Sequence, residues 1–214
     1  MNSLEESYFS ASFYGFNFAC SDDELFFNSE PQISQDIFTA AHVGNKEVVH
    51  SLISNEPYLA NAKNKENWNA IMYATYYNHQ EIVLFLLEKK APLHACNGKG
   101  QNVLMIASSM GYDTLVEQFL NLGSNIECRD GKDWTPLLYA VDNEFMKVVE
   151  VLLNYGANPN AMVRNTGKTP LIIAAYNGNC QLVKMLLSSG AYLDFKDCLG
   201  KDALSYAIEI GHKD

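Results

Sequence analysis

The sequence lacks the features that mark membrane, secreted or disulfide-linked proteins. No stretch of about 18 consecutive apolar residues occurs, so no membrane span is expected in this chain. The N-terminus has no basic region followed by an apolar core, so we expect no secretory signal. The five cysteines form no C-x-x-C pair: Cys20, Cys96, Cys128, Cys180 and Cys198. We expect reduced thiols in a cytoplasmic protein, with a bridge or metal site between Cys96 and Cys128 as the alternative.

Motifs of catalysis are also absent. The chain has no glycine-rich phosphate loop, no dinucleotide fingerprint, no H-E-x-x-H helix and no nucleophile elbow. Its five histidines are scattered: His42, His50, His79, His94 and His212. We therefore predict that the chain is not an enzyme and that it uses no cofactor and no metal.

Basic residues are missing from the beginning of the chain. Residues 1–45 contain seven acids and no lysine or arginine, in a chain with a formal net charge of −10. Binding to phosphate groups needs clustered Lys and Arg. Nucleic acid is therefore not expected as the main ligand.

What the sequence does have is a period. Six alanines recur at spacings of 34, 33, 33, 34 and 33 residues: Ala40, Ala74, Ala107, Ala140, Ala174 and Ala207. A fixed period near 33 indicates stacked structural repeats. The two longer spacings place one extra residue in the loops before the second and fifth repeats.

The neighbours of these alanines predict two short helices in each repeat. An aliphatic residue precedes each alanine by three positions, and an apolar run begins about eight positions after most of them. Such three- and four-residue steps give each helix one buried stripe. The fourth position after each alanine, usually glycine, predicts a left-handed end to the first helix: Gly44, Asn78, Gly111, Glu144, Gly178 and Gly211.

Two segments carry a family resemblance: Thr-Pro-Leu-Leu-Tyr-Ala at 135–140 and Thr-Pro-Leu-Ile-Ile-Ala-Ala at 169–175. Together with the repeated period, they resemble ankyrin repeats over about residues 35–214. The resemblance implies an all-α solenoid of stacked helix-turn-helix units. These units would start near residues 35, 69, 102, 135, 169 and 202, the last being incomplete.

The first two units also resemble a subgroup of this family. Residues 36–44 and 68–74 are similar to the N-terminal ankyrin block of ankyrin-plus-SAM proteins of cilia or germ-cell granules. That resemblance implies a larger scaffold with an oligomerising or catalytic domain beyond residue 214.

Residues 1–34 lie before the repeats and form an acidic, aromatic-rich N-terminal tail. Plain disordered linkers are poor in aromatics, so we expect the tail either to cap the first repeat or to bind another protein. Residues 21–30 resemble acidic two-phenylalanine motifs that bind a receptor on the endoplasmic reticulum. Glu24, Phe26 and Phe27 would carry that interaction.

The predicted binding site is the concave face of the array. Its residues are expected at the loop tips and at the ends of the first helices, and they include both tryptophans of the chain: Trp68, Tyr76, Tyr77, Lys99, Gln101, Met110, Lys132, Trp134, Asp142, Lys168, Tyr176 and Asn177. Trp and Tyr often carry binding energy at interfaces. The alternative for Trp68 and Trp134 is that they pack on the adjacent loop and stiffen it.

Asn160 lies in a turn that resembles the substrates of asparaginyl hydroxylases, so it is a candidate modification site.

Taken together, these features of the sequence predict a non-catalytic module or adaptor, monomeric as this chain, that binds a protein partner. The alternatives are a regulatory or targeting part of a larger scaffold and a structural spacer.

Overall fold

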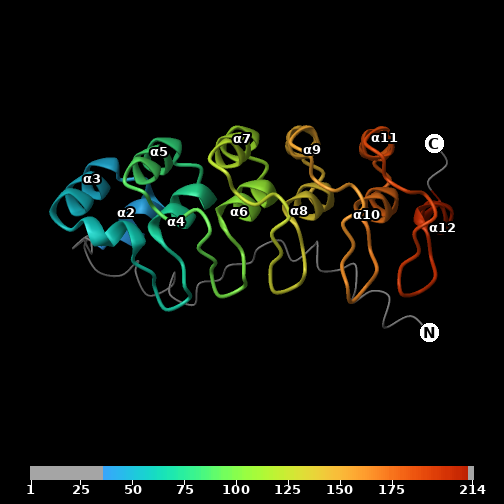
Figure 1. Cartoon of the computed structure of the whole chain (residues 1–214), viewed down its shortest axis with the longest axis horizontal. Helices are drawn as coiled ribbons and strands as arrows, with labels where there is room; N and C mark the ends of the chain where they lie inside the picture. The colour runs from blue at the N-terminus through green and yellow to red at the C-terminus, as the bar shows by residue number, and fades with distance from the viewer. Residues whose placement is uncertain (1–35, 212–214) are drawn as a thin grey trace. The chain divides into compact units, whose positions relative to one another are not determined.

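The computed structural model describes residues 36–211. Figure 1 shows the helices of these residues in two rows, with long loops extending from the first row. The first row contains α2 (Ile37–Val43), α4 (Ala70–Tyr76), α6 (Val103–Met110), α8 (Pro136–Asp142), α10 (Pro170–Asn177) and α12 (Ala203–Ile210). The second row contains α3 (Lys46–Asn55), α5 (Gln80–Glu88), α7 (Asp113–Asn121), α9 (Met146–Asn154) and α11 (Cys180–Ser188), and a short 3-10 helix, η1 (Pro57–Asn61), follows α3. The described part of the chain contains no strand, so the prediction of an all-α helix-turn-helix array is confirmed.

Burial explains the alanine period. Each first helix contacts the first helix of the next repeat along the whole row. The alanines at this contact in α4, α6, α8 and α10 are all 0% exposed: Ala74, Ala107, Ala140 and Ala174. A side chain larger than a methyl group would hold the helices apart and leave voids in a core of otherwise close-packed aliphatic residues.

Each first helix begins at a side chain that caps it. In all six cases, a polar side-chain oxygen accepts a hydrogen bond from the backbone N–H three residues later. The residues are Asp36, Asn69, Asn102, Thr135, Thr169 and Asp202. Such caps satisfy one of the otherwise unpaired N–H groups of the first turn. They also fix where each hairpin loop ends.

The first helices end in the left-handed conformation that the glycine column predicts. Gly44, Gly111, Gly178 and Gly211 have φ angles between 72° and 88°. In the second and fourth repeats, Asn78 and Glu144 adopt the same conformation, with φ angles of 58° and 59°. The backbone of the repeat therefore imposes this angle even where the residue disfavours it.

The longer spacing before the fifth repeat comes from its hairpin loop. That loop runs from Val163 to Lys168 and has one residue more than the loop from Asp130 to Trp134. The same prediction is wrong for the second repeat, whose hairpin from Asn64 to Trp68 has the ordinary length. The extra residue lies in α3, which has 10 residues where α5, α7, α9 and α11 have 9. None of the helices in residues 36–211 could cross a bilayer.

Candidate functional site

The hairpin loops that precede α4, α6, α8 and α12 are built around one polar side chain each. Asn64, Asn97, Asp130 and Asp197 each accept two backbone N–H groups from the residues two and four positions ahead. Asn and Asp favour such turns because their short side chains mimic a backbone carbonyl. The turns hold the residue at the end of each hairpin in a fixed place.

Successive hairpins are joined by backbone hydrogen bonds. The N–H of Gly98 donates to the carbonyl oxygen of Glu66 at 2.8 Å, and the N–H of Gly131 donates to that of Lys99 at 2.9 Å. A Cβ atom on Gly131 would lie 3.1 Å from that same oxygen. A larger residue would therefore have to push this carbonyl away by a few tenths of an ångström, so glycine favours the close approach. The hairpins of the second, third and fourth repeats form one continuous row.

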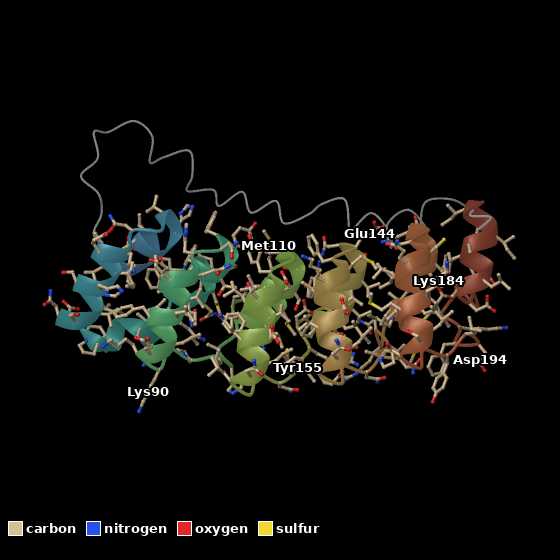
Figure 2. The ribbon with its side chains drawn as sticks, turned by 90° about the horizontal axis from the view of Figure 1, so that it is seen from above. Lys90, Met110, Glu144, Tyr155, Lys184 and Asp194 are labelled. Carbon is tan, nitrogen blue, oxygen red and sulfur yellow. The ribbon has the colours of Figure 1, made fainter. Side chains whose placement is uncertain are left out.

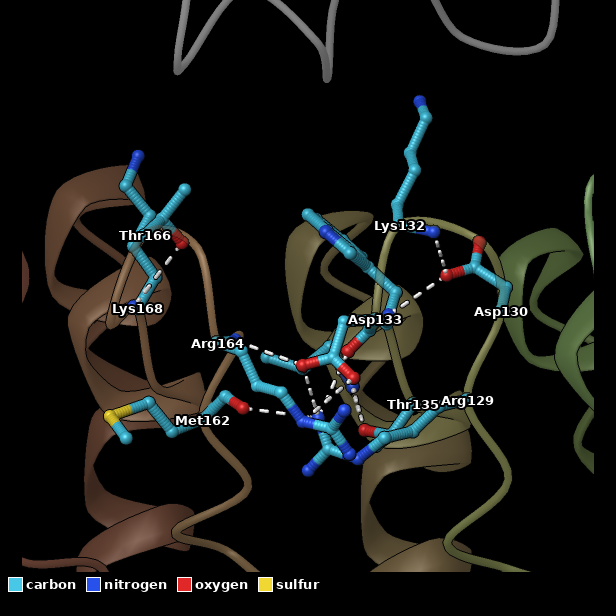
Figure 3. A network of polar contacts seen from close by, with 11 residues as sticks. Arg129, Asp130, Lys132, Asp133, Thr135, Met162, Arg164, Thr166 and Lys168 are labelled. Atoms are coloured by element: carbon cyan, nitrogen blue, oxygen red, sulfur yellow. Dashed lines mark hydrogen bonds and ion pairs between the residues drawn. The ribbon is translucent and has the colours of Figure 1, made fainter.

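The fourth and fifth hairpins are joined by side chains instead (Figure 3). Arg129 donates from one nitrogen to Asp133 Oδ2 at 2.9 Å and to the carbonyl oxygen of Met162 at 3.0 Å. Asp133 Oδ2 also accepts the backbone N–H of Arg164 at 2.9 Å. Only 15% of the Asp133 side chain is exposed. Its carboxylate is thus used inside the array, whereas the Lys132 side chain extends away from this network.

Both tryptophans end a hairpin and pack on a tyrosine five residues later. The ring centroids of Trp68 and Tyr73 lie 5.1 Å apart, as do those of Trp134 and Tyr139. Trp68 is only 3% exposed, whereas Trp134 is half-buried. The packing alternative therefore fits Trp68, whose buried ring has little surface to offer a partner.

The other predicted residues of the second repeat gather around Trp68. Tyr76 lies 6.0 Å from Trp68, and Tyr77 lies 5.0 Å from Tyr76, measured between ring centroids. Tyr77 also stacks on His42 at 4.2 Å and is 41% exposed. Burial raises the pKa of Tyr76. We call these rings, Trp68, Tyr73, Tyr76, Tyr77 and His42, the aromatic cluster.

A second group lies at the fifth and sixth repeats, where the predicted residues Lys168 and Tyr176 meet residues that were not predicted. The Lys168 amine lies 6.0 Å from the centroid of the Tyr176 ring, and Tyr176 meets Tyr206 edge to face at 5.9 Å. Lys201 lies 5.3 Å from the centroid of the Tyr206 ring and pairs with Glu209 at 2.9 Å. Lysines over aromatic faces gain cation–π attraction. We call these residues, Lys168, Tyr176, Lys201, Tyr206 and Glu209, the cationic cluster.

Lys168 is unusual for a lysine because only 8% of the residue is exposed. Burial lowers its pKa to about 8, against the opposing influence of the Asp197 and Asp142 carboxylates. A buried ammonium loses hydration that these acids do not fully replace.

Met110 and Asp142, the remaining predicted residues, are half-buried at the ends of α6 and α8. They lie between the two clusters along the row, and the Asp142 carboxylate acts on the cationic cluster by raising the pKa of Lys168 against the effect of burial. Figure 2 shows Met110 and Glu144 along one long edge of the helix array and Tyr155 at the opposite edge. We call the surface made by the hairpin ends and the ends of the first helices the hairpin face.

Asn160 holds two repeats together. Its amide nitrogen donates to the carbonyl oxygen of Gly190 at 3.0 Å, and its oxygen accepts the N–H of Tyr192 at 2.8 Å. Modification of this residue remains a prediction.

Glu24, Phe26 and Phe27 lie outside the described residues. Cys96, Cys128 and Cys198 are free thiols, and burial raises the pKa of Cys128 to about 11.

Sequence reasoning missed the tyrosines that support the hairpins. Tyr139 donates to Asp130 at 2.6 Å and Tyr206 donates to Asp197 at 2.5 Å, while Asn64 donates to the Tyr73 hydroxyl at 2.9 Å. In each case the tyrosine follows its partner by nine residues, a recurring spacing that was available as a signal. Within residues 36–211, no group of three or more His, Cys, Asp or Glu side chains is arranged to hold a metal ion.

Comparison with known proteins shows which family these repeats match. A family model described as ankyrin repeats (3 copies) matches residues 37–130, 104–197 and 161–214. The human ankyrin repeat and SAM domain-containing protein 3 is 39% identical over 59 residues. The matched region is 28% of this chain and only 9% of that relative's length.

Proposed function

Because this chain belongs to the ankyrin repeat family, we propose that it is a protein-interaction module whose partner binds the hairpin face, on the concave side of the array. Ankyrin repeats are a non-catalytic protein-interaction fold. The observation that carries the proposal is the aromatic cluster, in which Tyr77 is 41% exposed and packs on Tyr76 and His42. A tyrosine held rigidly by neighbouring rings offers a large contact area at little entropic cost.

The rest of the proposal follows from composition. Residues 1–34 are an acidic tail, and residues 35–214 are the repeat domain. The module has no enzymatic activity, does not bind nucleic acid, is monomeric, and acts in a reducing cytoplasm. Free thiols at Cys96, Cys128 and Cys198 and the net charge of −10 support these assignments.

The test compares two tyrosines of nearly equal exposure. Tyr77 is 41% exposed in the aromatic cluster, and Tyr155 is 40% exposed at the end of α9, away from the hairpin face. Proteins captured from a cell lysate by the chain, by Tyr77→Ala and by Tyr155→Ala are identified by mass spectrometry. We expect partners that Tyr77→Ala loses and Tyr155→Ala retains, with affinity reduced by about 2 kcal/mol. Identical protein sets for all three would contradict a role of this face.

A second candidate function is the regulatory or targeting part of a larger scaffold. It is favoured by the similarity to a relative whose name includes a SAM domain. In that case the hairpin face would select the cargo, and a domain elsewhere in the whole protein would oligomerise. Sedimentation of the whole protein and of this chain tests it, because it measures how many copies each particle contains. The same number of copies in both would exclude an oligomerising scaffold.

A further inference from the structure

The first helices end at a common edge of the array, and neighbouring repeats touch each other there. The His79 ring packs against the end of α2, because a Cβ atom on Gly44 would lie only 2.6 Å from it. The Phe145 ring packs against the end of α6 in the same way, 2.7 Å from a Cβ atom on Gly111. Rings fixed between repeats make this edge rigid, and a rigid surface binds at a low cost in entropy. We call the last residues of the first helices, with the turns that follow them, the helix-end edge.

The first three repeats place apolar side chains at the helix-end edge. Val43 ends α2 and is 67% exposed, and Tyr77 follows α4 and is 41% exposed. Met110 ends α6, is half-buried and lies along the edge in Figure 2. All three follow the alanine of their repeat by three residues, so they form a stripe with one side chain per repeat. In the fourth and fifth repeats, Asn143 and Asn177 hold this position, and the apolar stripe ends.

The edge becomes acidic where the stripe ends. Glu144 is exposed in the turn after α8 (Figure 2), with the φ angle of 59° that glycine adopts at little cost. Within residues 36–211, its carboxylate takes part in no hydrogen bond or ion pair. A residue kept in an unfavourable conformation at an exposed position points to a function of its side chain. Asp113, in the first turn of α7, adds a second carboxylate to the same edge.

These acids favour a basic group from outside the chain. In the first repeat, the edge residue Lys46 is already paired with Glu81 at 2.7 Å. Residues 1–45 contain no lysine or arginine, so the chain's own N-terminal segment lacks the side chain that would pair with Glu144. An acidic surface on a chain with a formal net charge of −10 attracts cationic segments of other proteins.

The spacing of the stripe selects the conformation of such a segment. Neighbouring packed helices lie about 8–10 Å apart. A polyproline II segment has three residues per turn and rises about 3.1 Å per residue, so its side chains return to the same face about every 9 Å. A β-strand returns to the same face about every 7 Å and would fall out of register within two repeats. Polyproline II geometry therefore matches one contact per repeat.

We propose that the helix-end edge binds a polyproline II segment of another protein. Large apolar side chains at every third residue of this segment contact Val43, Tyr77 and Met110. A lysine or arginine three residues beyond them pairs with Glu144. This inference rests on the proposed function, because it describes the chemistry of the partner. A preformed polyproline II segment loses little entropy on binding, which suits a shallow surface of exposed side chains.

The test uses the full chain and fluorescent peptides of about 12 residues, with binding measured by fluorescence anisotropy. The ordered peptide has three leucines spaced by three residues, an arginine three residues beyond them and prolines elsewhere. A scrambled peptide of the same composition has its leucines in a row, which places them on different faces. Both peptides are made with the arginine at either end, because a polyproline II segment can bind in two directions. We expect one direction of the ordered peptide to bind at least about tenfold more tightly than its scrambled control. Equal binding of ordered and scrambled peptides in both directions would overturn the proposal.

A double-mutant cycle tests the ion pair with Glu144. Glu144→Gln should weaken the arginine peptide by about threefold to fivefold, as expected for an exposed ion pair. It should not weaken a peptide with glutamine in place of arginine. Glu150→Gln removes the same charge at an exposed position within α9 and should leave both peptides unchanged. An equal loss in the two variants would show unspecific charge attraction and would overturn the proposal.

A second pair of variants tests the apolar stripe. Val43→Ser should weaken the ordered peptide by about threefold or more, because it removes exposed apolar surface at one end of the stripe. Leu84→Ser changes a 45% exposed residue of α5, outside the helix-end edge, and should leave binding unchanged. Both side chains are exposed, so neither change removes part of the core. Equal binding by Val43→Ser and Leu84→Ser would overturn the proposal.

Other occupants are outcomes of the same assay. Tighter binding of a helical peptide with leucines at every seventh residue would identify a helical partner and overturn the proposal. Self-association of the chain that Glu144→Lys abolishes would identify a second copy as the occupant and would also overturn it. If the peptides fail but Tyr77→Ala still loses proteins that Tyr155→Ala captures, only the chemistry of the partner is wrong. If both experiments fail, the proposed function is wrong as well.

Discussion

The hydroxyl of Tyr139 donates a hydrogen bond of 2.6 Å to Asp130 across nine residues of the chain. The same hydroxyl accepts from the amide of Gln101, in the preceding hairpin, at 2.8 Å. Burial, followed by the Asp130 carboxylate, raises the pKa of Tyr139 far above its usual value. Two hairpins and one helix are thus joined at a single phenol.

Removing this hydroxyl should destabilise the fold. Tyr139→Phe leaves an Asp130 oxygen and the Gln101 amide without this partner, at a cost of about 1–3 kcal/mol in the free energy of unfolding. Urea unfolding followed by circular dichroism measures it. Tyr155→Phe is the control, because its hydroxyl bonds Asn121 at a 40% exposed position and should change stability by less than about 0.5 kcal/mol. Equal effects would mean that the Tyr139 contact contributes nothing special.

A substitution at one left-handed helix end should increase the stability of the fold. Glu144 has a φ angle of 59° in a column that is otherwise glycine or asparagine. Glu144→Gly should stabilise the fold by about 0.5–1 kcal/mol, because glycine adopts this angle without steric cost. Thermal unfolding measures the change. Glu144→Gln separates the effect of charge and should give no such gain.

The opposite substitution in the same column should be harmful. Gly111 has a φ angle of 79°, and a Cβ atom there would lie 2.7 Å from the ring of Phe145 in the next repeat. Gly111→Ala should therefore lower the free energy of unfolding by more than about 1 kcal/mol. A neutral result would show that the repeats can shift to absorb a methyl group.

The repeat architecture could be predicted because each repeat has its own local sequence signals, and these signals recur in every repeat. The alanine and glycine columns reflect close helix contacts and left-handed backbone, which recur at the same place in every unit. The capping residues, such as Asn102 and Thr135, carried an equally clear signal that the prediction did not use.

The exposure of site residues could not be predicted from the columns. Trp68 and Trp134 occupy the same column and pack on equivalent tyrosines, yet only Trp68 is buried. The two repeats also differ at the ends of their first helices, where the second repeat has Tyr76 and the fourth has Asp142. The Tyr76 ring lies 6.0 Å from Trp68. Burial thus depends on a partner in three dimensions that the column itself does not contain.

This difference predicts unequal effects of the two tryptophans on folding. Trp68→Ala should cost about 3–5 kcal/mol because it removes a fully enclosed ring. Trp134→Ala should cost about 1–2 kcal/mol, as expected for a half-buried side chain. Urea unfolding of both variants tests the order. The reverse order would mean that Trp134, rather than Trp68, is the structural residue, and would restore Trp68 as a contact residue.

The buried amine of Lys168 predicts a pH dependence of stability. Its pKa falls from 10.5 to about 8 on folding, so folding favours loss of its proton. The resulting penalty is fully present below pH 8 and disappears as the pH rises toward 10.5. Lys168→Met should therefore raise the free energy of unfolding on the order of 1–3 kcal/mol at pH 7. This advantage should shrink steadily between pH 8 and pH 10, as measured by urea unfolding across that range. Lys147→Met, at an exposed position on α9, should have no effect at any of these pH values. A Lys168→Met variant that is less stable than the wild type at pH 7 would show that the ammonium is held by its neighbours more strongly than burial opposes it.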